Sequence, residues 1–337
     1  MKARTKAILR TVNISRVWNL VLLKLSFQLS ALLKKPFHWG KPMAISIEPT
    51  TTCNLKCPQC PSGLRNFTRP TGNLELELNE KILQEVGKQL QHINYYFQGE
   101  PFVHPQFLSL VRAARARNIY VVTSTNAHFI SETTATEIVE SDLSEIIVSI
   151  DGMTQETYEN YRINGKLDKV IQGTKNIIDA KIRLKRANPI LVFQFLVTKQ
   201  NEHEIDALYA LAEQLGVDEV RLKTVQIYDF EAGNDLIPTD DRYARYRKNK
   251  AGQYELKNKW KNKCWRMWSS CVFTWDGKIV PCCFDKDAEH QMGNLKLATF
   301  SEIWKSAVYD GFRREVLRDR QQIEICKNCS EGSQVWV

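Results

Sequence analysis

The chain has 337 residues, of which 43% are hydrophobic, so it is long enough to bury one large core and a smaller one. Its net charge of +9 is unevenly placed, because nine basic residues and no acidic one precede Glu48, whereas the remainder holds equal numbers of each. We therefore expect no nucleic acid partner, since no basic surface extends across the fold. Nine cysteines without an export signal indicate reduced thiols in the cytosol rather than disulfides.

Residues 1–42 form a basic arm with a repeat of apolar residues. The residues that recur at helical spacing are Ile14, Val17, Trp18, Val21, Leu22, Leu25, Leu29, Leu32 and Leu33. This repeat predicts an amphipathic helix. Lys24 leaves uncharged stretches shorter than the roughly 20 residues of a membrane span, and no cleavage pattern of a signal peptide follows. We expect a cytoplasmic protein whose arm packs on the main fold; the alternative is peripheral contact with an anionic inner membrane face.

A cysteine motif follows the first predicted strand. The β-rich run Met43–Pro49 leads directly to Cys53, Cys57 and Cys60, in the spacing C-x3-C-x2-C. Three thiolates this close together make a poor disulfide framework and are one ligand short of a closed zinc site. They are the right number to hold three irons of a four-iron cluster while the fourth iron stays open. The motif therefore predicts an iron–sulfur cluster with one accessible iron.

Strand-like and helix-like segments alternate through residues 43–224. The predicted strands after Met43–Pro49 are His92–Phe97, Ile119–Thr123, Glu145–Ile150, Ile190–Val197 and Glu219–Lys223. The predicted helices are Asn79–Leu90, Gln106–Arg117, Thr133–Glu140, Leu167–Lys185 and Glu204–Leu215. This alternation predicts a parallel sheet with right-handed crossovers, two units short of a closed barrel. The expected fold class is α/β, a partial (β/α)6 TIM-like barrel with its chemistry at the carboxyl ends of the strands.

The motif and the barrel together resemble the radical S-adenosylmethionine (radical SAM) superfamily, in which the open iron binds SAM. Four later segments are similar to the superfamily's SAM contacts, namely QGEP at residues 98–101, TSTNAH, VSIDG and YENYR. The SAM-binding residues that the resemblance implies are Gly99, Glu100, Pro101, Asn126, Ser149, Asp151, Arg162 and Gln194. In the superfamily the glutamate receives the SAM ammonium and the arginine pairs with its carboxylate. Gln59 and Gln98 depart from the superfamily's pattern, which more often has an aromatic residue and a glycine there.

Two further segments follow the predicted barrel. Residues 225–263 form a polar connector whose charge run predicts a solvated face, with a lid or docking strip as the alternative. Residues 264–337 are expected to form a small α+β iron–sulfur domain. Within it, an Asp-Gly turn at Gly277 predicts a β-hairpin, and Thr299 with Glu302 predicts the capping box of a helix.

This last domain contains a second group of cysteines. It resembles the short form of the SPASM/twitch extension of radical SAM enzymes, which holds an auxiliary 4Fe-4S cluster. The ligands that the resemblance implies are Cys264, Cys282, Cys326 and Cys329. Cys271 lies too close to Gly277 for the family pattern, so Cys271 and Cys283 are expected to be buried thiols. The alternative is a zinc ribbon, since two distant pairs ending in C-x2-C suit tetrahedral zinc equally well.

The resemblance implies a radical enzyme. A 4Fe-4S cluster on the first three cysteines, reduced by a partner such as flavodoxin or ferredoxin, cleaves SAM to a 5′-deoxyadenosyl radical that removes a substrate hydrogen. A cluster held by four cysteines has no open iron, so we expect it to accept an electron from the substrate. The net reaction would then be a two-electron oxidation.

Several substrate classes remain open. A small molecule such as a sugar, alcohol or lipid precursor is the first expectation, because residues 1–42 look too short and too helical for the leader-binding domain of many peptide modifiers. A peptide or protein side chain is the alternative, and a non-catalytic iron–sulfur scaffold or electron carrier is the third. No general base is assigned; His128, Lys223 and Gln226 are candidates for the substrate side, with core or surface roles as the alternative.

Overall fold

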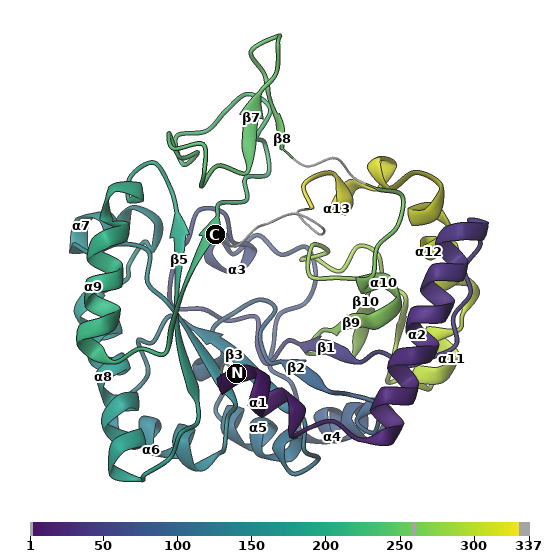
Figure 1. Cartoon of the computed structure of the whole chain (residues 1–337), viewed down its shortest axis with the longest axis horizontal. Helices are drawn as coiled ribbons and strands as arrows, with labels where there is room; N and C mark the ends of the chain where they lie inside the picture. The colour runs from purple at the N-terminus through teal and green to yellow at the C-terminus, as the bar shows by residue number, and fades with distance from the viewer. Residues whose placement is uncertain (1–2, 258–260, 330–337) are drawn as a thin grey trace.

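The computed structural model describes residues 3–257 and 261–329, and a nine-stranded sheet forms its centre (Figure 1). The strand order is β11-β10-β9-β1-β2-β3-β4-β5-β6. Six strands follow one another in chain order and pair parallel, namely β1 (Ala44–Ile47), β2 (His92–Asn94), β3 (Tyr120–Thr125), β4 (Glu145–Ser149), β5 (Ile190–Val197) and β6 (Glu219–Thr224). The predicted partial barrel of six parallel strands is confirmed.

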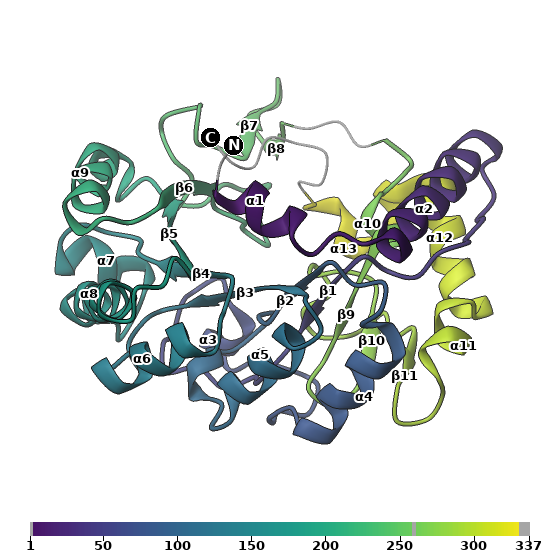
Figure 2. The ribbon, with the colours of Figure 1, turned by 60° about the horizontal axis from the view of Figure 1, so that its bottom comes forward.

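Helices connect these strands and cover the outer face of the sheet, as parallel crossovers require (Figure 2). They are α3 (Pro61–Leu64), α4 (Leu76–Val86), the 3-10 turn η1 (Pro101–Val103), α5 (Phe107–Arg115), α6 (Glu132–Glu140), α7 (Gln155–Tyr161), α8 (Leu167–Arg183), η2 (Glu202–Glu204) and α9 (Ile205–Leu215). Their apolar faces share one core with the outward side chains of the strands, for example Val111 of α5 with Val121 of β3 and Val148 of β4. The strand and helix patterns of the sequence are thus confirmed, with small shifts at their ends.

Helix α1 (Ala3–Leu9) closes the barrel at the end where its strands begin. Ala7 and Ile8 pack against the second core cluster of Tyr120, Val122, Ile147, Ile190 and Val192. Arg4 donates to Glu145, the first residue of β4, at 2.7 Å and pairs with Glu219, the first residue of β6, also at 2.7 Å. Because α1 occupies this end, the opposite end, where the strands finish, is left for a functional site.

Helix α2 (Ile14–Leu33) packs along the C-terminal segment of the chain. The ring of Phe27 lies 5.3 Å from that of Trp265 and 5.4 Å from that of Trp268, in edge contacts. The indole nitrogen of Trp268 donates to the carbonyl oxygen of Phe37 at 2.8 Å, which fixes the chain just after the helix. Among the described residues, α2 is the one helix that is long and apolar enough to cross a membrane, by length and composition alone.

The C-terminal segment extends the barrel sheet. Strand β9 (Ser270–Phe273) pairs parallel with β1, β10 (Lys278–Val280) pairs antiparallel with β9, and β11 (Gly293–Asn294) pairs with β10. Its helices are α10 (Arg266–Ser269), α11 (Phe300–Trp304), α12 (Ala307–Asp319), the 3-10 turn η3 (Arg320–Gln322) and α13 (Glu324–Lys327). The predicted hairpin is confirmed, with Gly277 at φ 87°, and so is the capping box of Thr299 and Glu302 on α11.

The polar connector folds over the cysteine loop. Its strands β7 (Tyr246–Lys248) and β8 (Tyr254–Leu256) form a hairpin that projects from the body (Figure 1). Lys248 in this hairpin is exposed, as a solvated charge run predicts. In contrast, Ile227 and Tyr246 are buried in one cluster with Leu55 and Cys57 of the cysteine loop. The prediction of a solvated charge run therefore holds for Arg247 and Lys248 but not for Arg245, which is buried.

The buried carboxylate of Glu145 allows a test of the contact between α1 and the barrel. Its side chain is 3% exposed and bonds Arg4 and Arg221, each at 2.7 Å. Glu145→Gln should lower the free energy of unfolding by about 1–3 kcal/mol, because the guanidinium groups of Arg4 and Arg221 lose their buried partner charge and keep only that of Glu219. Asp142→Asn is the control, since Asp142 is 56% exposed in its pair with Arg115 and should cost less than about 1 kcal/mol. Urea unfolding followed by circular dichroism measures both, and equal losses would contradict this role of Glu145.

Candidate active site

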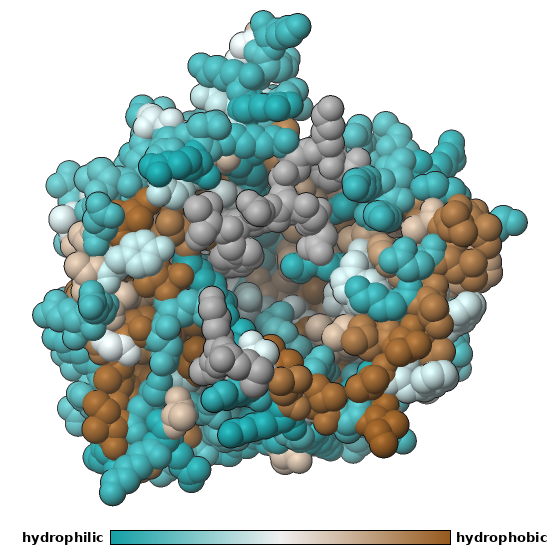
Figure 3. All heavy atoms as spheres, viewed as in Figure 1, coloured by the Kyte–Doolittle hydropathy of each residue, from teal (hydrophilic) through white to brown (hydrophobic). Residues whose placement is uncertain are grey.

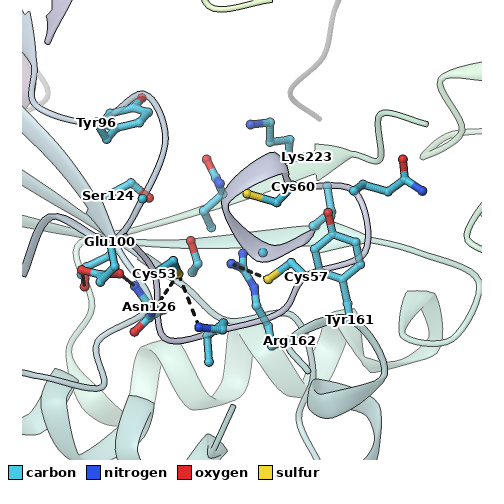
Figure 4. A pocket seen from close by; sticks show the side chains of 18 of the residues that line it. Cys53, Cys57, Cys60, Tyr96, Glu100, Ser124, Asn126, Tyr161, Arg162 and Lys223 are labelled. Carbon is cyan, nitrogen blue, oxygen red and sulfur yellow. Dashed lines mark hydrogen bonds between the residues drawn. The ribbon is translucent and has the colours of Figure 1, made fainter. Parts of the chain in front are cut away.

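A pocket lies at the carboxyl ends of the barrel strands, at the end opposite α1 (Figure 4). The sequence-predicted residues that line it are Cys53, Cys57, Cys60, Gly99, Glu100, Asn126, Ser149, Arg162 and Gln194. They come from β4 and β5 and from the segments that follow β1, β2, β3 and β4, so the parallel order of the sheet brings them together. Two predicted residues, Pro101 and Asp151, do not line the pocket.

Two of the three thiols of the motif receive hydrogen bonds from the protein. Cys53 Sγ lies 3.5 Å from the backbone nitrogen of Leu55 and 3.9 Å from Asn126 Nδ2. Cys57 Sγ lies 3.8 Å from Arg162 Nη1, and Figure 4 shows both contacts between side chains. Donors aimed at sulfur stabilise the thiolate, which is the form that binds metal.

The two departures from the superfamily's pattern lie beside the same loop. Gln98 Oε1 is 3.8 Å from Cys60 Sγ, and Gln98 is buried. Gln59 Oε1 accepts the backbone N–H of Tyr228 at 3.4 Å, which joins the cysteine loop to the connector. Both substitutions thus make contacts that an aromatic residue or a glycine would not make.

The chemistry of the three thiols fits an iron–sulfur cluster. All three are free cysteines. Burial raises the pKa of Cys53 to about 12 and also raises that of Cys57, where Arg162 acts in the opposite direction. In the part of the chain that the structure describes, no three His, Cys, Asp or Glu side chains are grouped as a mononuclear site needs. Three thiols that line one pocket are the number that can hold a four-iron cluster with one iron open.

The turn after β2 allows the backbone to approach the cysteine loop. Gly99 has φ 75°, and a Cβ atom there would lie 2.2 Å from the carbonyl oxygen of Thr50. Only glycine is accommodated, as the resemblance implies. Glu100 is 3% exposed, and its carboxylate accepts hydrogen bonds from the Asn126 backbone at 2.7 Å and Thr125 Oγ1 at 2.8 Å. These bonds hold the carboxylate at the pocket wall, and burial raises its pKa.

Polar side chains from three strand ends complete the wall. Asn126 follows β3, and its Nδ2 donates to Asn54 Oδ1 at 2.7 Å. Ser149, the last residue of β4, is directly paired in register with Gln194 of β5. These side chains present hydroxyl and amide groups to the pocket, which are suited to the polar groups of a nucleoside.

Arg162 is held by a carboxylate at the pocket wall. Its Nε donates to Asp151 Oδ2 at 2.5 Å, and Asp151 Oδ1 accepts the backbone N–H of Leu196 at 2.6 Å. Burial opposes the charged guanidinium, but Asp151 and Cys57 outweigh it, so the pKa of Arg162 lies well above its ordinary value. Both oxygens of Asp151 are engaged in these bonds, so its side chain positions Arg162 and β5.

Several residues that sequence analysis did not assign also line the pocket. Tyr96, Phe97 and Ser124 extend it along β2 and β3, and Lys286 contributes from the C-terminal segment. Ser124 and Thr125, the last two residues of β3, both line it, so their place at the carboxyl end of a predicted strand could have indicated them. No local signal marks Lys286, because its position follows from the pairing of β9 with β1.

The three candidates for the substrate side are placed differently. Lys223 and Gln226 line the pocket, whereas His128 does not. His128 Nε2 accepts the backbone N–H of Lys166 at 2.8 Å, which is a structural role. Burial and, less strongly, Arg245 lower the pKa of Lys223 to about 8.

The second group of cysteines lies around a buried arginine. None of Cys264, Cys282, Cys326 and Cys329 forms a disulfide. Cys282 interacts electrostatically with Cys264 and Cys329, and Cys326 interacts with Cys264, so the predicted ligands lie in one neighbourhood. Arg320 is 3% exposed, and its Nη2 donates to Cys329 Sγ at 2.9 Å. Sequence analysis missed this arginine, which places a positive charge beside the sulfurs.

The remaining two cysteines have different surroundings. Cys271 is buried at 1% exposure within β9, opposite Ile45 of β1, as expected of a core thiol. Cys283 was also expected to be buried, but it is partly exposed, and Arg266 Nη1 lies 3.6 Å from its sulfur. The difference arises because Cys283 follows the end of β10, outside the sheet core.

Comparison with known families agrees with this geometry. The family described as "Radical SAM superfamily" matches residues 47–212, and the family described as "SPASM: Iron-sulfur cluster-binding domain" matches residues 264–330. The first match covers the cysteine loop and the strand ends of the pocket. The second covers the four cysteines around Arg320.

Relatives of similar length are also found. The tungsten-containing aldehyde ferredoxin oxidoreductase cofactor-modifying protein of Pyrococcus furiosus is 24% identical, over 84% of this chain and 86% of its own. PqqA peptide cyclase of Gluconobacter oxydans is 26% identical, over 88% of this chain and 84% of its own. Mycofactocin maturase MftC of Mycobacterium tuberculosis is 28% identical, over 60% of this chain and 50% of its own.

Solved structures share the fold. Streptococcus suis SuiB bound to its precursor peptide SuiA superposes with a TM-score of 0.63 at 16% identity, over 87% of this chain and 71% of that one. BtrN in complex with AdoMet and 2-DOIA superposes with a TM-score of 0.53 at 17% identity, over 88% of this chain and 95% of that one. With the cysteine motif, the pocket and both family matches in agreement, the chain belongs to the radical SAM superfamily and carries a SPASM domain; it is an enzyme that uses a 4Fe-4S cluster, SAM and auxiliary iron–sulfur chemistry.

Proposed function

We propose that this enzyme removes a hydrogen atom from a side chain of a peptide or protein substrate. The observation that carries the proposal is the similarity to PqqA peptide cyclase, which extends over 88% of this chain. Mycofactocin maturase MftC supports the same substrate class. The small-molecule substrate first expected from the sequence has less support among these relatives, and a non-catalytic scaffold is excluded by the enzymatic family.

Each part of the pocket has an assigned task in this proposal. Cys53, Cys57 and Cys60 would hold the SAM-binding cluster, and the remaining polar groups of the wall would hold SAM. Bound together, the reduced cluster and SAM supply a 5′-deoxyadenosyl radical that abstracts a hydrogen atom. Arg162 offers a guanidinium for the SAM carboxylate, and Glu100 offers a carboxylate for its ammonium.

The connector excludes water from the cysteine loop. Ile227 is 1% exposed and Tyr246 is 1% exposed, and both pack in the cluster that includes Cys57. Tyr246 also donates to Asn328 Oδ1 at 2.9 Å, two residues from the predicted ligand Cys326. A dry, closed wall protects a radical from side reactions with solvent.

The substrate side of the pocket is cationic. Lys223 from β6 and Lys286 from the C-terminal segment line it together with the phenol of Tyr96 (Figure 4 labels Lys223 and Tyr96). Two ammonium groups in a partly enclosed site suit an anionic group, such as a side-chain or terminal carboxylate of a peptide.

The second cysteine set is assigned to electron transfer. Four cysteines leave no open iron for substrate, so Cys264, Cys282, Cys326 and Cys329 would hold an auxiliary 4Fe-4S cluster. Held there, the cluster would supply a one-electron acceptor, so that the substrate would lose one hydrogen atom and one electron. The balance is a two-electron oxidation of the substrate, with flavodoxin or ferredoxin as the proposed donor of the electron that cleaves SAM.

Deuterium transfer tests the substrate class directly. An extract of the source organism grown in deuterated medium is separated by dialysis into small molecules and a peptide and protein fraction. Each fraction is added to anaerobic enzyme with SAM and dithionite, and 5′-deoxyadenosine is analysed by mass spectrometry. We expect deuterium in this product with the peptide and protein fraction, because the abstracted atom comes from the substrate. Label obtained only with the small-molecule fraction would reject the proposal and favour a small-molecule oxidation.

Removal of one thiol of the motif should separate the two clusters. We expect about eight irons per parent chain and about four in Cys57→Ala, with loss of 5′-deoxyadenosine formation. Cys271→Ala is the matched control, because this buried thiol is not a predicted ligand and should leave both the iron content and the product unchanged. Iron and sulfide are counted on anaerobically purified protein. A parent chain with about four irons and one zinc would instead assign the second set to a zinc site.

Arg320 allows a test of the second cysteine set. Arg320→Met should make the midpoint potential of the auxiliary cluster more negative, because a positive charge and a hydrogen bond at Cys329 stabilise the reduced state. Arg320→Lys should give an intermediate value, and Arg318→Met, on the exposed side of α12, should leave it unchanged. A redox titration followed by electron paramagnetic resonance measures the potential. Equal potentials in all four proteins would show that Arg320 does not act on a cluster.

A further inference from the structure

Helix α2 presents its apolar side to solvent and its polar side to the protein. The buried residues of this helix are Arg16, Asn19, Leu23, Ser26, Phe27 and Ser30. Exposed apolar residues of the helix are Ile14, Val17, Trp18, Val21, Leu25, Leu32 and Leu33. This is the reverse of a surface helix in a globular protein, whose apolar stripe faces the core.

The apolar stripe is continuous along the helix. Consecutive residues of an α-helix are about 100° apart around its axis, so Ile14, Trp18, Val21, Leu25 and Leu32 share one side. Trp18 is 62% exposed and Leu32 is 78% exposed. In Figure 3 these hydrophobic residues gather over α2, along one edge of the molecule. Monomeric soluble proteins rarely leave such a continuous surface without a function.

The polar side of α2 fixes the helix on the protein. Asn19 donates to the carbonyl oxygen of Lys41 at 2.8 Å and accepts the backbone N–H of Lys41 at 2.9 Å. Arg16 donates to the carbonyl oxygen of Asn118 at 2.7 Å. Ser30 Oγ accepts the backbone N–H of Phe37 at 2.8 Å. A helix that crossed a bilayer would have to break these bonds, so the contacts favour a helix that lies on a surface.

Tryptophans and basic residues accompany the stripe. Trp18 and Trp39 line one surface pocket, which Lys41 and Lys305 also line. Trp39 is 49% exposed, and tryptophan rings are enriched where lipid headgroups meet the acyl region. At the far end of the helix, Lys34 is exposed.

The segment of the chain that contains this helix carries charge of one sign. Residues 1–47 contain nine basic side chains and no acidic one. Arg10 and Lys6 before the helix and Lys35 after it are exposed. Arg4 and Lys24 are already used within the protein, by the barrel carboxylates and by the ring of Trp265. An apolar stripe with exposed cations at both ends is complementary to an anionic lipid surface.

We propose that α2 docks this enzyme on an anionic membrane, with its apolar stripe in the interface and the neighbouring lysines on lipid headgroups. We choose a lipid surface over a second copy of the protein because two copies that met through this surface would bring their basic residues together. The docking is independent of the substrate class proposed above. The two proposals can fail separately, because the vesicle-binding experiment needs neither SAM nor a reductant.

Vesicle sedimentation tests the proposal with the full-length protein. Binding is compared on phosphatidylcholine vesicles and on vesicles that also contain phosphatidylglycerol, at low and at high salt. We expect binding to the anionic vesicles and release by salt. Trp18→Glu should weaken the affinity roughly tenfold or more, because it removes a large apolar side chain from the stripe. Lys34→Gln with Lys35→Gln should weaken it roughly 25-fold, at about fivefold for each lysine.

Controls separate docking from other surface effects. Ile182→Glu on α8 changes a side chain that is 71% exposed on the other side of the body, and it should leave vesicle binding unchanged. Circular dichroism checks that each variant keeps the fold. Absence of binding to anionic vesicles would overturn the proposal. Retention of the protein on vesicles in alkaline carbonate would also overturn it, because it would indicate a membrane-spanning helix. A third contradicting result would be a protein that does not bind vesicles and whose mass by light scattering falls from dimer to monomer in Trp18→Glu.

Discussion

The parallel pairing of β1 on both of its sides is the constraint on which the site depends. Residues 44–46 of β1 pair with β2 and residues 44–47 pair with β9, so the chain after Ile47 leaves the sheet where all the barrel strands end. The next residue, Glu48, is fully buried and is bound by Arg69 at 2.6 Å and by the backbone of Trp275 at 3.3 Å. The cysteine loop is thus fastened between the barrel and the C-terminal segment.

The two cysteine sets share an electrostatic arrangement. Arg162 lies beside Cys57, and Arg320 lies beside Cys329, and both arginines are largely withdrawn from solvent. Thiolate-bound clusters carry negative charge, which is costly in a poorly solvated interior unless a cation is near. Arg162 is in turn held by Asp151, so the guanidinium that offers a contact to SAM is oriented by the protein.

Much of the fold could be predicted from periodicity and local turn chemistry, because strands, helices, the Gly277 turn and the Thr299 cap are short-range signals. The residues around Cys53 could be predicted only through the superfamily's motifs. The pairing of β9 with β1 could not be predicted, because no local sequence pattern specifies a partner so distant in the chain. The position of Lys286 in the pocket could not be predicted for the same reason. Amphipathic spacing located α2 but could not show that Asn19 and its polar neighbours face inward, because burial of polar residues depends on hydrogen-bond partners elsewhere.

The barrel is closed by α1 at one end, and the three thiols line a pocket at the other end. We infer that these three thiolates leave one iron of a cluster open for SAM, and we propose that α2 docks the enzyme on a lipid surface. The most direct measurement is the electron paramagnetic resonance spectrum of the dithionite-reduced protein before and after SAM is added. We expect the signal of the three-cysteine cluster to shift when SAM binds its open iron. Identical spectra at saturating SAM would contradict it.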